Sequence, residues 1–246
     1  MSMPDNLGAI RQRPYRNIFL ALVALFFADA LIADRLARGA LGDTVVVFAL
    51  FAALFETVRS RRHTAVALIL GTPAILGRLV GVFRADSVAW NSVVLASTAL
   101  FIGFVIWNLL RDLLVGERST GERVYGALCA YLFIGLLFAL LFTNMEFRSP
   151  GSFLFSGKAV SDASSSEAAL LPTFTYYSFV TLTTLGYGDI APATGHARTL
   201  AWLEALIGQL YLAVMVATLV GIRVSEGLRA GDGRTGGGGD ENLGAG

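Results

Sequence analysis

Charged residues are scarce in this chain. They make up 15% of its 246 residues, against roughly 25% in ordinary soluble domains. Hydrophobic residues make up 55%, and the mean hydropathy is +0.65. The net charge of +1 provides no basic field of the kind that attracts nucleic acid. The composition therefore predicts a membrane protein surrounded by lipid, and it argues against a nucleic-acid partner.

Residue types that carry out chemistry are equally few. The single cysteine, Cys129, lies in an apolar run and has no partner for a disulfide within the chain. The two histidines, His63 and His196, lie at the ends of apolar segments. No nucleophile, base or metal cluster converges at one depth. The sequence therefore predicts that the protein is not an enzyme and uses no cofactor and no small-molecule substrate.

Long apolar runs dominate the rest of the chain. A helix that crosses a bilayer needs about 20 mostly apolar residues. The first apolar run superficially resembles a signal peptide, but five further runs follow it and no convincing small-residue cleavage site does, so we expect it to be retained. The sequence predicts six membrane spans, at 17–33, 44–58, 64–83, 88–110, 124–143 and 199–222.

The distribution of basic residues predicts the orientation, because cytoplasmic loops are enriched in Lys and Arg. With residues 1–16 in the cytoplasm, most of the 19 Lys and Arg residues fall on that side. Both termini are then cytoplasmic, in a plasma membrane. The tail, 223–246, is short and Gly-rich, so we expect it to be disordered.

The first four spans, 17–110, form a unit that a polar linker, 111–123, separates from the last two. Asp29 and Arg78 both fall inside predicted spans, where ionisable groups are costly and usually paired. We expect the two to pair. The pair is either a structural clasp, which we favour, or a regulatory site.

Between the last two spans lies Thr183-Thr184-Leu185-Gly186-Tyr187-Gly188-Asp189. A dehydrated cation needs several oxygen ligands, and a membrane pore can supply them from backbone carbonyls. The carbonyls can point to one axis only if alternate residues adopt unusual backbone conformations, and Gly186 and Gly188 tolerate positive φ. Pro172 is suited to start a short re-entrant helix. The motif occurs once, so four chains would be needed to surround an ion.

These residues resemble a known family. The run Thr184 to Asp189 is similar to the selectivity filter of potassium channels, and 176–184 is similar to the end of their pore helix. Leu185 departs from the family, where Val is more common. The resemblance implies an all-α membrane protein with six transmembrane helices, a re-entrant pore helix and a filter, assembled as a homotetramer that conducts K⁺. It also suggests a bacterial inner membrane.

The resemblance also divides the chain. It implies a pore domain over 124–222, with an outer helix 124–143, a turret 144–171, a pore helix 172–183, the filter 184–189 and an inner helix 199–222. The unit 17–110 corresponds to a sensor-like domain. Its fourth span, 88–110, contains no Lys or Arg, whereas voltage sensors carry regularly spaced arginines there. We therefore expect conduction to be insensitive to voltage.

The resemblance assigns roles to individual residues in three groups. The predicted K⁺ ligands come from the filter, the supporting residues stand behind it, and the gating residues lie on the inner helix. The ligands are Thr184, Leu185, Gly186, Tyr187 and Gly188; the supporting residues are Tyr176, Tyr177, Thr181, Asp189 and Glu204; the gating residues are Gly208, Leu212, Val216 and Val220. The resemblance also implies that Tyr187 and the neighbouring pore-helix aromatics form a cuff around the filter, and that the Tyr176 hydroxyl bonds to Asp189.

Several roles stay open at the level of sequence. Gly208 is either a hinge or a site of close helix packing, and Leu212, Val216 and Val220 are either an apolar gate or ordinary packing. We favour a hydrogen bond from Glu204 to the pore helix over a proton-sensitive gate, because an unpaired charge at that depth is costly. Two alternatives to a potassium channel also remain: a weakly selective cation channel, and a non-conducting membrane subunit or scaffold.

Overall fold

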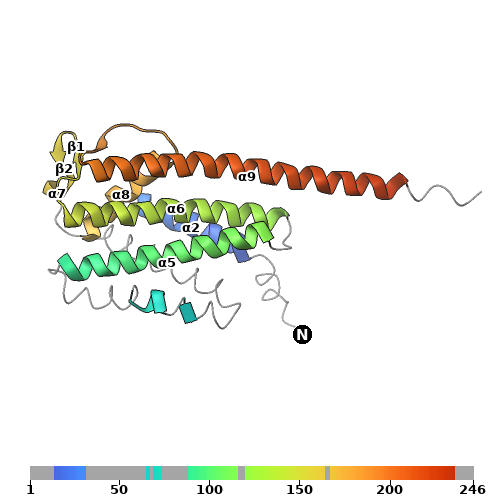
Figure 1. Ribbon diagram of the computed structural model, residues 1–246, viewed down its shortest axis with the longest axis horizontal. Helices are drawn as coiled ribbons and strands as arrows, with labels where there is room; N and C mark the ends of the chain where they lie inside the picture. Colours follow the sequence, from blue (N-terminus) through green and yellow to red (C-terminus); the bar gives the residue numbers. More distant parts are fainter. Residues whose placement is uncertain are drawn as a thin grey trace, which may run out of the picture.

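The computed structural model describes residues 14–31, 65–66, 69–73, 88–115, 120–163 and 167–235. Predicted span 44–58, most of span 64–83, Arg78, the side chain of Asp29 and residues 236–246 lie outside the described part. The long helices are α2 (Pro14–Leu31), α5 (Val88–Val115), α6 (Thr120–Arg148), α8 (Glu167–Leu182) and α9 (Gly195–Thr235), shown in Figure 1.

Three of these helices contain segments long and apolar enough to cross a membrane: Ala89–Leu114, Gly121–Arg148 and Gly195–Ser225. They correspond to the fourth, fifth and sixth predicted spans, and Tyr15–Ala24 in α2 is a shorter apolar segment. The protein is therefore mostly helical in its described part, and its helices suit a membrane.

Two predicted boundaries are wrong. Most of the predicted linker 111–123 is helical, because α5 continues to Val115 and α6 begins at Thr120. The predicted disordered tail is helical as far as Thr235. Both errors have one physical reason: once an apolar span has formed a helix, each further residue adds a hydrogen bond without the cost of a new nucleus.

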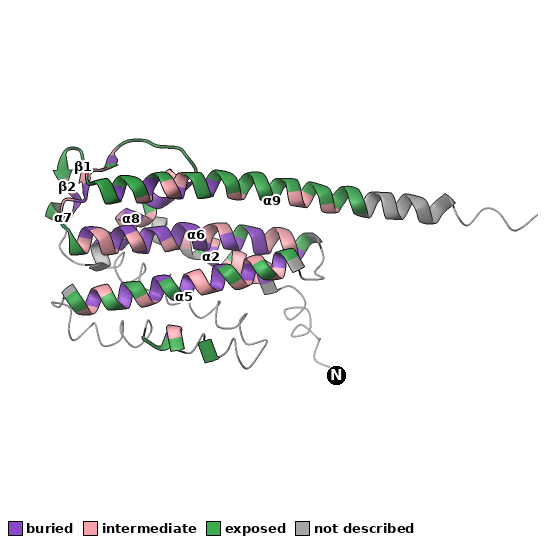
Figure 2. Ribbon diagram, viewed as in Figure 1, coloured by how far each residue is buried: buried purple, intermediate pink, exposed green. Residues whose placement is uncertain are grey.

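The helices pack around α6. Helix α5 lies along it, and α2, α8 and α9 also contact it. Phe101 of α5 and Phe133 and Leu136 of α6 are buried members of one hydrophobic core. Helix α9 differs, because only 6% of its apolar segment is buried within the chain, against 61% for α6 (Figure 2). The apolar surface of α9 must therefore meet lipid or other chains.

A small antiparallel sheet, which the expectation of an all-α fold did not include, lies partly within the turret predicted over 144–171. Its strands, β1 (Phe153–Phe155), β2 (Lys158–Ala159) and β3 (Ile190–Pro192), lie in the order β2-β1-β3. In the second pairing, Phe153 lies opposite Pro192 and Phe155 opposite Ile190. The short helix α7 (Val160–Ala163) follows β2. The turret is thereby attached to the strand that follows the loop 183–189.

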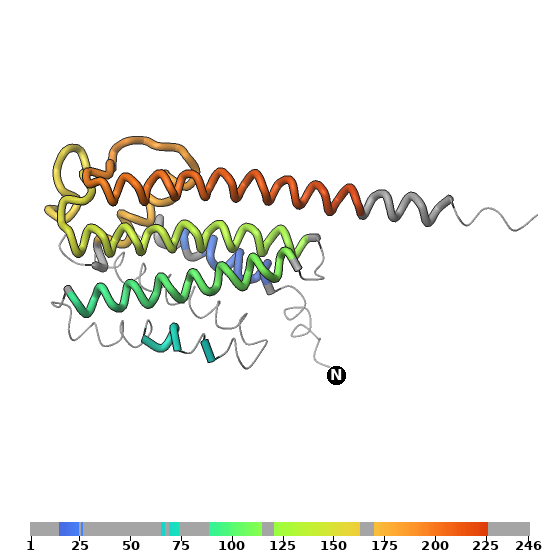
Figure 3. The backbone as a smooth tube through the Cα atoms, viewed as in Figure 1, coloured from blue at the N-terminus to red at the C-terminus, as the bar shows by residue number. Residues whose placement is uncertain are grey.

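The pore helix also begins earlier than predicted. Helix α8 starts at Glu167, so Pro172 lies inside it and not at its first position. Pro172 is the sixth residue of the helix, so it lacks the N–H that would otherwise bond to the Ala168 carbonyl, and the helix nevertheless continues through it to Leu182. After α8, the chain runs back along α9 to the end of the bundle that carries the sheet (Figure 3).

Candidate pore loop

The loop 183–189 connects the end of α8 to β3 and has an alternating backbone. Thr184, Gly186 and Gly188 have φ values of 58°, 58° and 78°. The positive φ expected at the two glycines is therefore present. Thr184 adopts it too, although a β-branched residue in this region is an outlier whose strain costs on the order of 1–3 kcal/mol. Such a conformation persists only where the surroundings hold it in place.

The start of the loop is bonded to the end of α8. The backbone N–H of Thr184 donates to the Thr181 carbonyl at 2.9 Å. The N–H groups of Leu185 and Gly186 donate to the Val180 carbonyl at 2.9 and 3.3 Å. The backbone N–H groups of Thr184, Leu185 and Gly186 are therefore all bonded to carbonyls of α8.

Between Thr183 and Asp189, whose carbonyls both accept hydrogen bonds, the carbonyls of the loop remain open to ligands. Residues 183–188 are all exposed in the single chain. Among the described residues, no hydrogen bond is recorded to the carbonyls of 184–188. Several exposed carbonyl oxygens in succession, without protein donors, are the ligand type that a dehydrated cation requires.

Asp189 anchors the far end of the loop. The Tyr176 hydroxyl donates to Asp189 Oδ2 at 2.8 Å, which confirms the hydrogen bond expected between these residues. The N–H of Ser156, between β1 and β2, donates to the Asp189 carbonyl at 3.2 Å. The loop end is thus fixed both by α8 and by the turret.

The predicted aromatic cuff is not formed within one chain. Tyr187 is 67% exposed. Tyr177, in contrast, is buried and packs edge-on against Phe142 of α6 and Phe153 of β1, with ring centroids 5.1 and 5.3 Å apart. Tyr177 therefore supports α8 from behind, and a cuff around Tyr187 stays a prediction for an assembly.

Glu204 is fully buried on α9, behind the loop. The Ser178 hydroxyl lies within hydrogen-bond distance of Glu204 Oε1 and of the Gly135 carbonyl, the latter at 2.7 Å. The predicted bond from Glu204 to the pore helix is therefore present. Glu204 Oε2 is buried and has no partner among the described residues. This contact joins α9, α8 and α6 at one depth, while the proton-sensitive gate stays a prediction.

Two glycines bring neighbouring helices close to α8. A Cβ on Gly208 would lie 2.3 Å from the Leu182 carbonyl oxygen, the last carbonyl of α8. A Cβ on Gly135 would lie 2.7 Å from the Phe179 ring. The first contact is what the packing interpretation of Gly208 requires; the hinge stays a prediction. Farther along α9, Leu212, Val216 and Val220 are exposed in the single chain, so their gating role also stays a prediction.

Sequence reasoning missed Gln209. Its Nε2 donates to Thr184 Oγ1 at 3.1 Å, which links α9 directly to the first residue of the alternating backbone. A signal was available, because a carboxamide within an apolar membrane span is costly and needs a partner. The identity of that partner, however, depends on how α8 and α9 are placed.

Sequence reasoning also missed Glu146, near the end of α6. It is fully buried, and it accepts backbone hydrogen bonds from Gly151 and Phe153, both at 2.9 Å, and from Ser161 at 3.2 Å. One carboxylate thus holds the chain before β1 and after β2. This arrangement explains why the turret is ordered despite its polar sequence.

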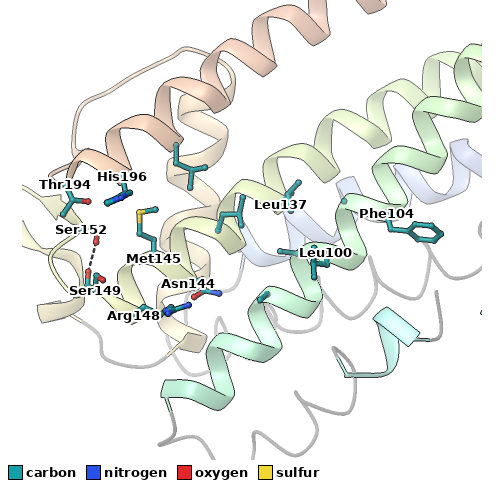
Figure 4. Close-up of a pocket in the computed structure, with 15 residues that line it drawn as sticks. Leu100, Phe104, Leu137, Asn144, Met145, Arg148, Ser149, Ser152, Thr194 and His196 are labelled. Atoms are coloured by element: carbon teal, nitrogen blue, oxygen red, sulfur yellow. Dashed lines mark hydrogen bonds between the residues drawn. The ribbon is translucent and has the colours of Figure 1, made fainter. Parts of the chain in front are cut away.

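A separate cleft of about 1070 Å³ lies between α5, α6 and the start of α9 (Figure 4). Leu100, Leu137 and Leu141 line its apolar part, and Arg148 and His196 stand at one end. None of the residues 183–189 lines it. The cleft is therefore distinct from the pore loop.

Comparison with known proteins agrees with this geometry. Residues 126–224, which run from α6 into α9 and include the loop, match the protein family described as "Ion channel". The chain is 30% identical over 112 residues to "Potassium voltage-gated channel subfamily V member 1" of Rattus norvegicus and of Mus musculus. The aligned part covers 45% of this chain and 22% of each relative.

These matches support an ion channel, and within ion channels they support the potassium channel superfamily. The matched segment coincides closely with the pore domain predicted over 124–222. The matched family and relatives are ion channels and not enzymes, which agrees with the prediction that this chain is not an enzyme. The chain spans about a fifth of the length of the curated relatives it matches.

Proposed function

We propose that four copies of this chain form a potassium-selective channel that conducts K⁺ passively across the plasma membrane, with both termini in the cytoplasm. The observation that carries the proposal is the loop 183–189. It combines positive φ at alternate residues with the exposed residues 184–188, whose carbonyls accept no recorded hydrogen bond among the described residues. The match of residues 126–224 to ion channels supports it.

The loop residues would replace the water shell of the ion. The carbonyl oxygens of Thr184, Leu185, Gly186 and Tyr187, together with the Thr184 hydroxyl, are the proposed ligands. Helix α8 ends at Leu182, directly before the loop, so its negative C-terminal end, equivalent to about half an elementary charge, adds to the attraction for cations. No cofactor enters this proposal, and K⁺ is the transported species.

The need for four chains follows from the exposure of the site. One loop presents its oxygens from one side only, whereas a dehydrated ion needs them all round. The loop and the apolar surface of α9 are both exposed in the single chain. Non-helical backbone at membrane depth is tolerated only where protein buries it or where it lines a cavity. A tetramer around the loop meets both conditions.

Voltage insensitivity is part of the same proposal. Helix α5 carries no Lys or Arg between Val88 and Leu110. Moving charge across the membrane potential supplies the energy that opens a voltage sensor, and this helix has no basic charge to move over that length. A shallow conductance–voltage curve is therefore expected, and a steep one would contradict this part of the proposal.

The test is ion flux through the purified protein in liposomes, with reversal potentials in mixed K⁺ and Na⁺. The variant Gly186→Ala places a Cβ on a residue with a φ of 58°, at a cost of roughly 1–2 kcal/mol. We expect it to assemble but to lose selectivity. Gly103→Ala is the control, because a Cβ there meets none of the described residues within 4 Å.

The outcomes separate the alternatives. Wild-type selectivity for K⁺ that Gly186→Ala abolishes would support the proposal. Equal permeation of K⁺ and Na⁺ by the wild type would indicate the weakly selective channel. A wild type that assembles but passes no cation would indicate the non-conducting subunit or scaffold.

A further inference from the structure

The hydrogen bond between Gln209 and Thr184 joins the inner helix to the start of the loop. Gln209 Nε2 lies 3.1 Å from Thr184 Oγ1, and both residues are exposed on the side of the chain where the ion path is proposed. The bond joins α9 to the loop just after the end of α8. The bond is therefore placed where it can act on the innermost oxygen ligand.

The Thr184 hydroxyl has a limited number of bonds to make. A hydroxyl provides one donor and two acceptor sites. In the structure Thr184 Oγ1 donates to the Thr183 carbonyl at 2.7 Å and accepts from Gln209. One acceptor site remains. With its proton turned to Thr183, the hydroxyl presents oxygen and not hydrogen to an approaching cation.

Thr184 needs support from its surroundings, because its φ of 58° is an outlier for a β-branched residue. Its backbone N–H is bonded to Thr181 of α8 and its hydroxyl to Gln209 of α9. The residue is thus held from two helices. Without the bond to Gln209, the residue would be held only by α8 and by its own bond to the neighbouring Thr183 carbonyl.

Gly208 makes the reach of Gln209 possible. The absence of a side chain at Gly208 lets α9 approach the Leu182 carbonyl so closely that a Cβ would lie 2.3 Å from its oxygen. The next residue of α9 is then within hydrogen-bond distance of the second residue of the loop. The consecutive residues Gly208 and Gln209 therefore contact the end of α8 and the loop, respectively.

We propose that Gln209 is a positioning residue that orients the Thr184 hydroxyl and thereby sets which monovalent cations the innermost site of the filter accepts. The inference rests on the proposed function, because it assumes that ions pass along the loop. On this proposal the Gln209 carboxamide affects which cations pass, which a bond that only stabilises the fold would not do.

The test measures reversal potentials for K⁺, Rb⁺ and Na⁺ in the wild type and in Gln209→Leu, which keeps a comparable size and removes the donor. Since one hydrogen bond is lost, we expect the permeability ratios to change about 2- to 10-fold. Thr218→Val is the matched control on the same helix, because its hydroxyl bonds only to the Val214 carbonyl of α9 at 2.8 Å. Its ratios should equal those of the wild type.

A second pair of variants separates orientation from a general effect of Gln209 on the fold. In a Thr184→Ala background the hydroxyl is gone, so adding Gln209→Leu should change the ratios no further. Potassium flux in the wild type with unchanged ratios in Gln209→Leu would overturn this inference alone. So would an additive effect in the double variant. A wild type that passes no potassium would overturn the proposed function, and this inference with it.

Discussion

The close contact of Gly208 permits a quantitative prediction. In Gly208→Ala the new methyl group would lie 2.3 Å from the Leu182 carbonyl oxygen and 3.0 Å from Leu182 Cδ1. The first neighbour is backbone and cannot rotate away, so α9 and α8 must separate by roughly 0.7 Å even to reach 3.0 Å. Overpacking of this kind costs about 1–3 kcal/mol, and the better helix propensity of alanine offsets about 1 kcal/mol.

Since the gain in helix propensity offsets part of the overpacking cost, we expect Gly208→Ala to lower the free energy of unfolding by up to about 2 kcal/mol per chain. The measurement is thermal or chemical dissociation of the purified assembly, with potassium flux recorded in parallel. Leu182 directly precedes the loop, so its displacement should reduce flux as well. Gly221→Ala is the control on the same helix, because a Cβ there meets nothing within 4 Å, and it should be neutral or stabilising.

The result also separates the two interpretations of Gly208. A hinge without a packing role predicts that Gly208→Ala is as stable as Gly221→Ala and changes only how often the channel opens. If Gly208→Ala were as stable as Gly221→Ala, the packing argument would be refuted. A loss of stability confined to Gly208→Ala would support it.

Three further predictions concern the buried carboxyl groups. In the wild type, backbone N–H groups share the two carboxylate oxygens of Glu146, whereas Glu146→Gln offers only one acceptor oxygen, so at least one buried N–H loses its partner. The free energy of unfolding should fall by about 1–3 kcal/mol, and unchanged thermal stability would contradict this. Ser178→Ala removes the hydrogen-bond partner of Glu204 and should lower the free energy of unfolding by about 1–3 kcal/mol. The double variant Ser178→Ala/Glu204→Leu should recover part of that loss in the same thermal assay. If Glu204 is a proton-sensitive gate, Glu204→Gln should flatten the dependence of conductance on pH, and an unchanged curve would exclude that role.

The pore loop could be predicted from the sequence because its determinants are local. The need for positive φ at Gly186 and Gly188 follows from the motif itself, and both glycines have it. The bond between Tyr176 and Asp189 spans only the helix end and the loop, so it too could be expected. Residues that lie this close together along the chain can be arranged relative to one another in few other ways.

The features that were missed depend on distant pairings. The bond between Gln209 and Thr184 requires α9 to lie against the end of α8, which no local pattern specifies. The pairing of Phe153 with Pro192 joins two very short strands across the whole pore helix, and strands of this length show no readable alternation. The positive φ of Thr184 was missed for a different reason, since β-branched residues normally avoid it.

The short connection between α5 and α6 has a mechanical consequence. Only residues 116–119 separate Val115 from Thr120, and a chain reaches at most about 3.5 Å per residue. Helix α5 lies along the α6 of its own chain. In a tetramer, a force applied to α5 would therefore be transmitted first within the same subunit. Each of the four subunits would then respond to the force on its own α5, and the four responses would add without passing through a neighbouring subunit.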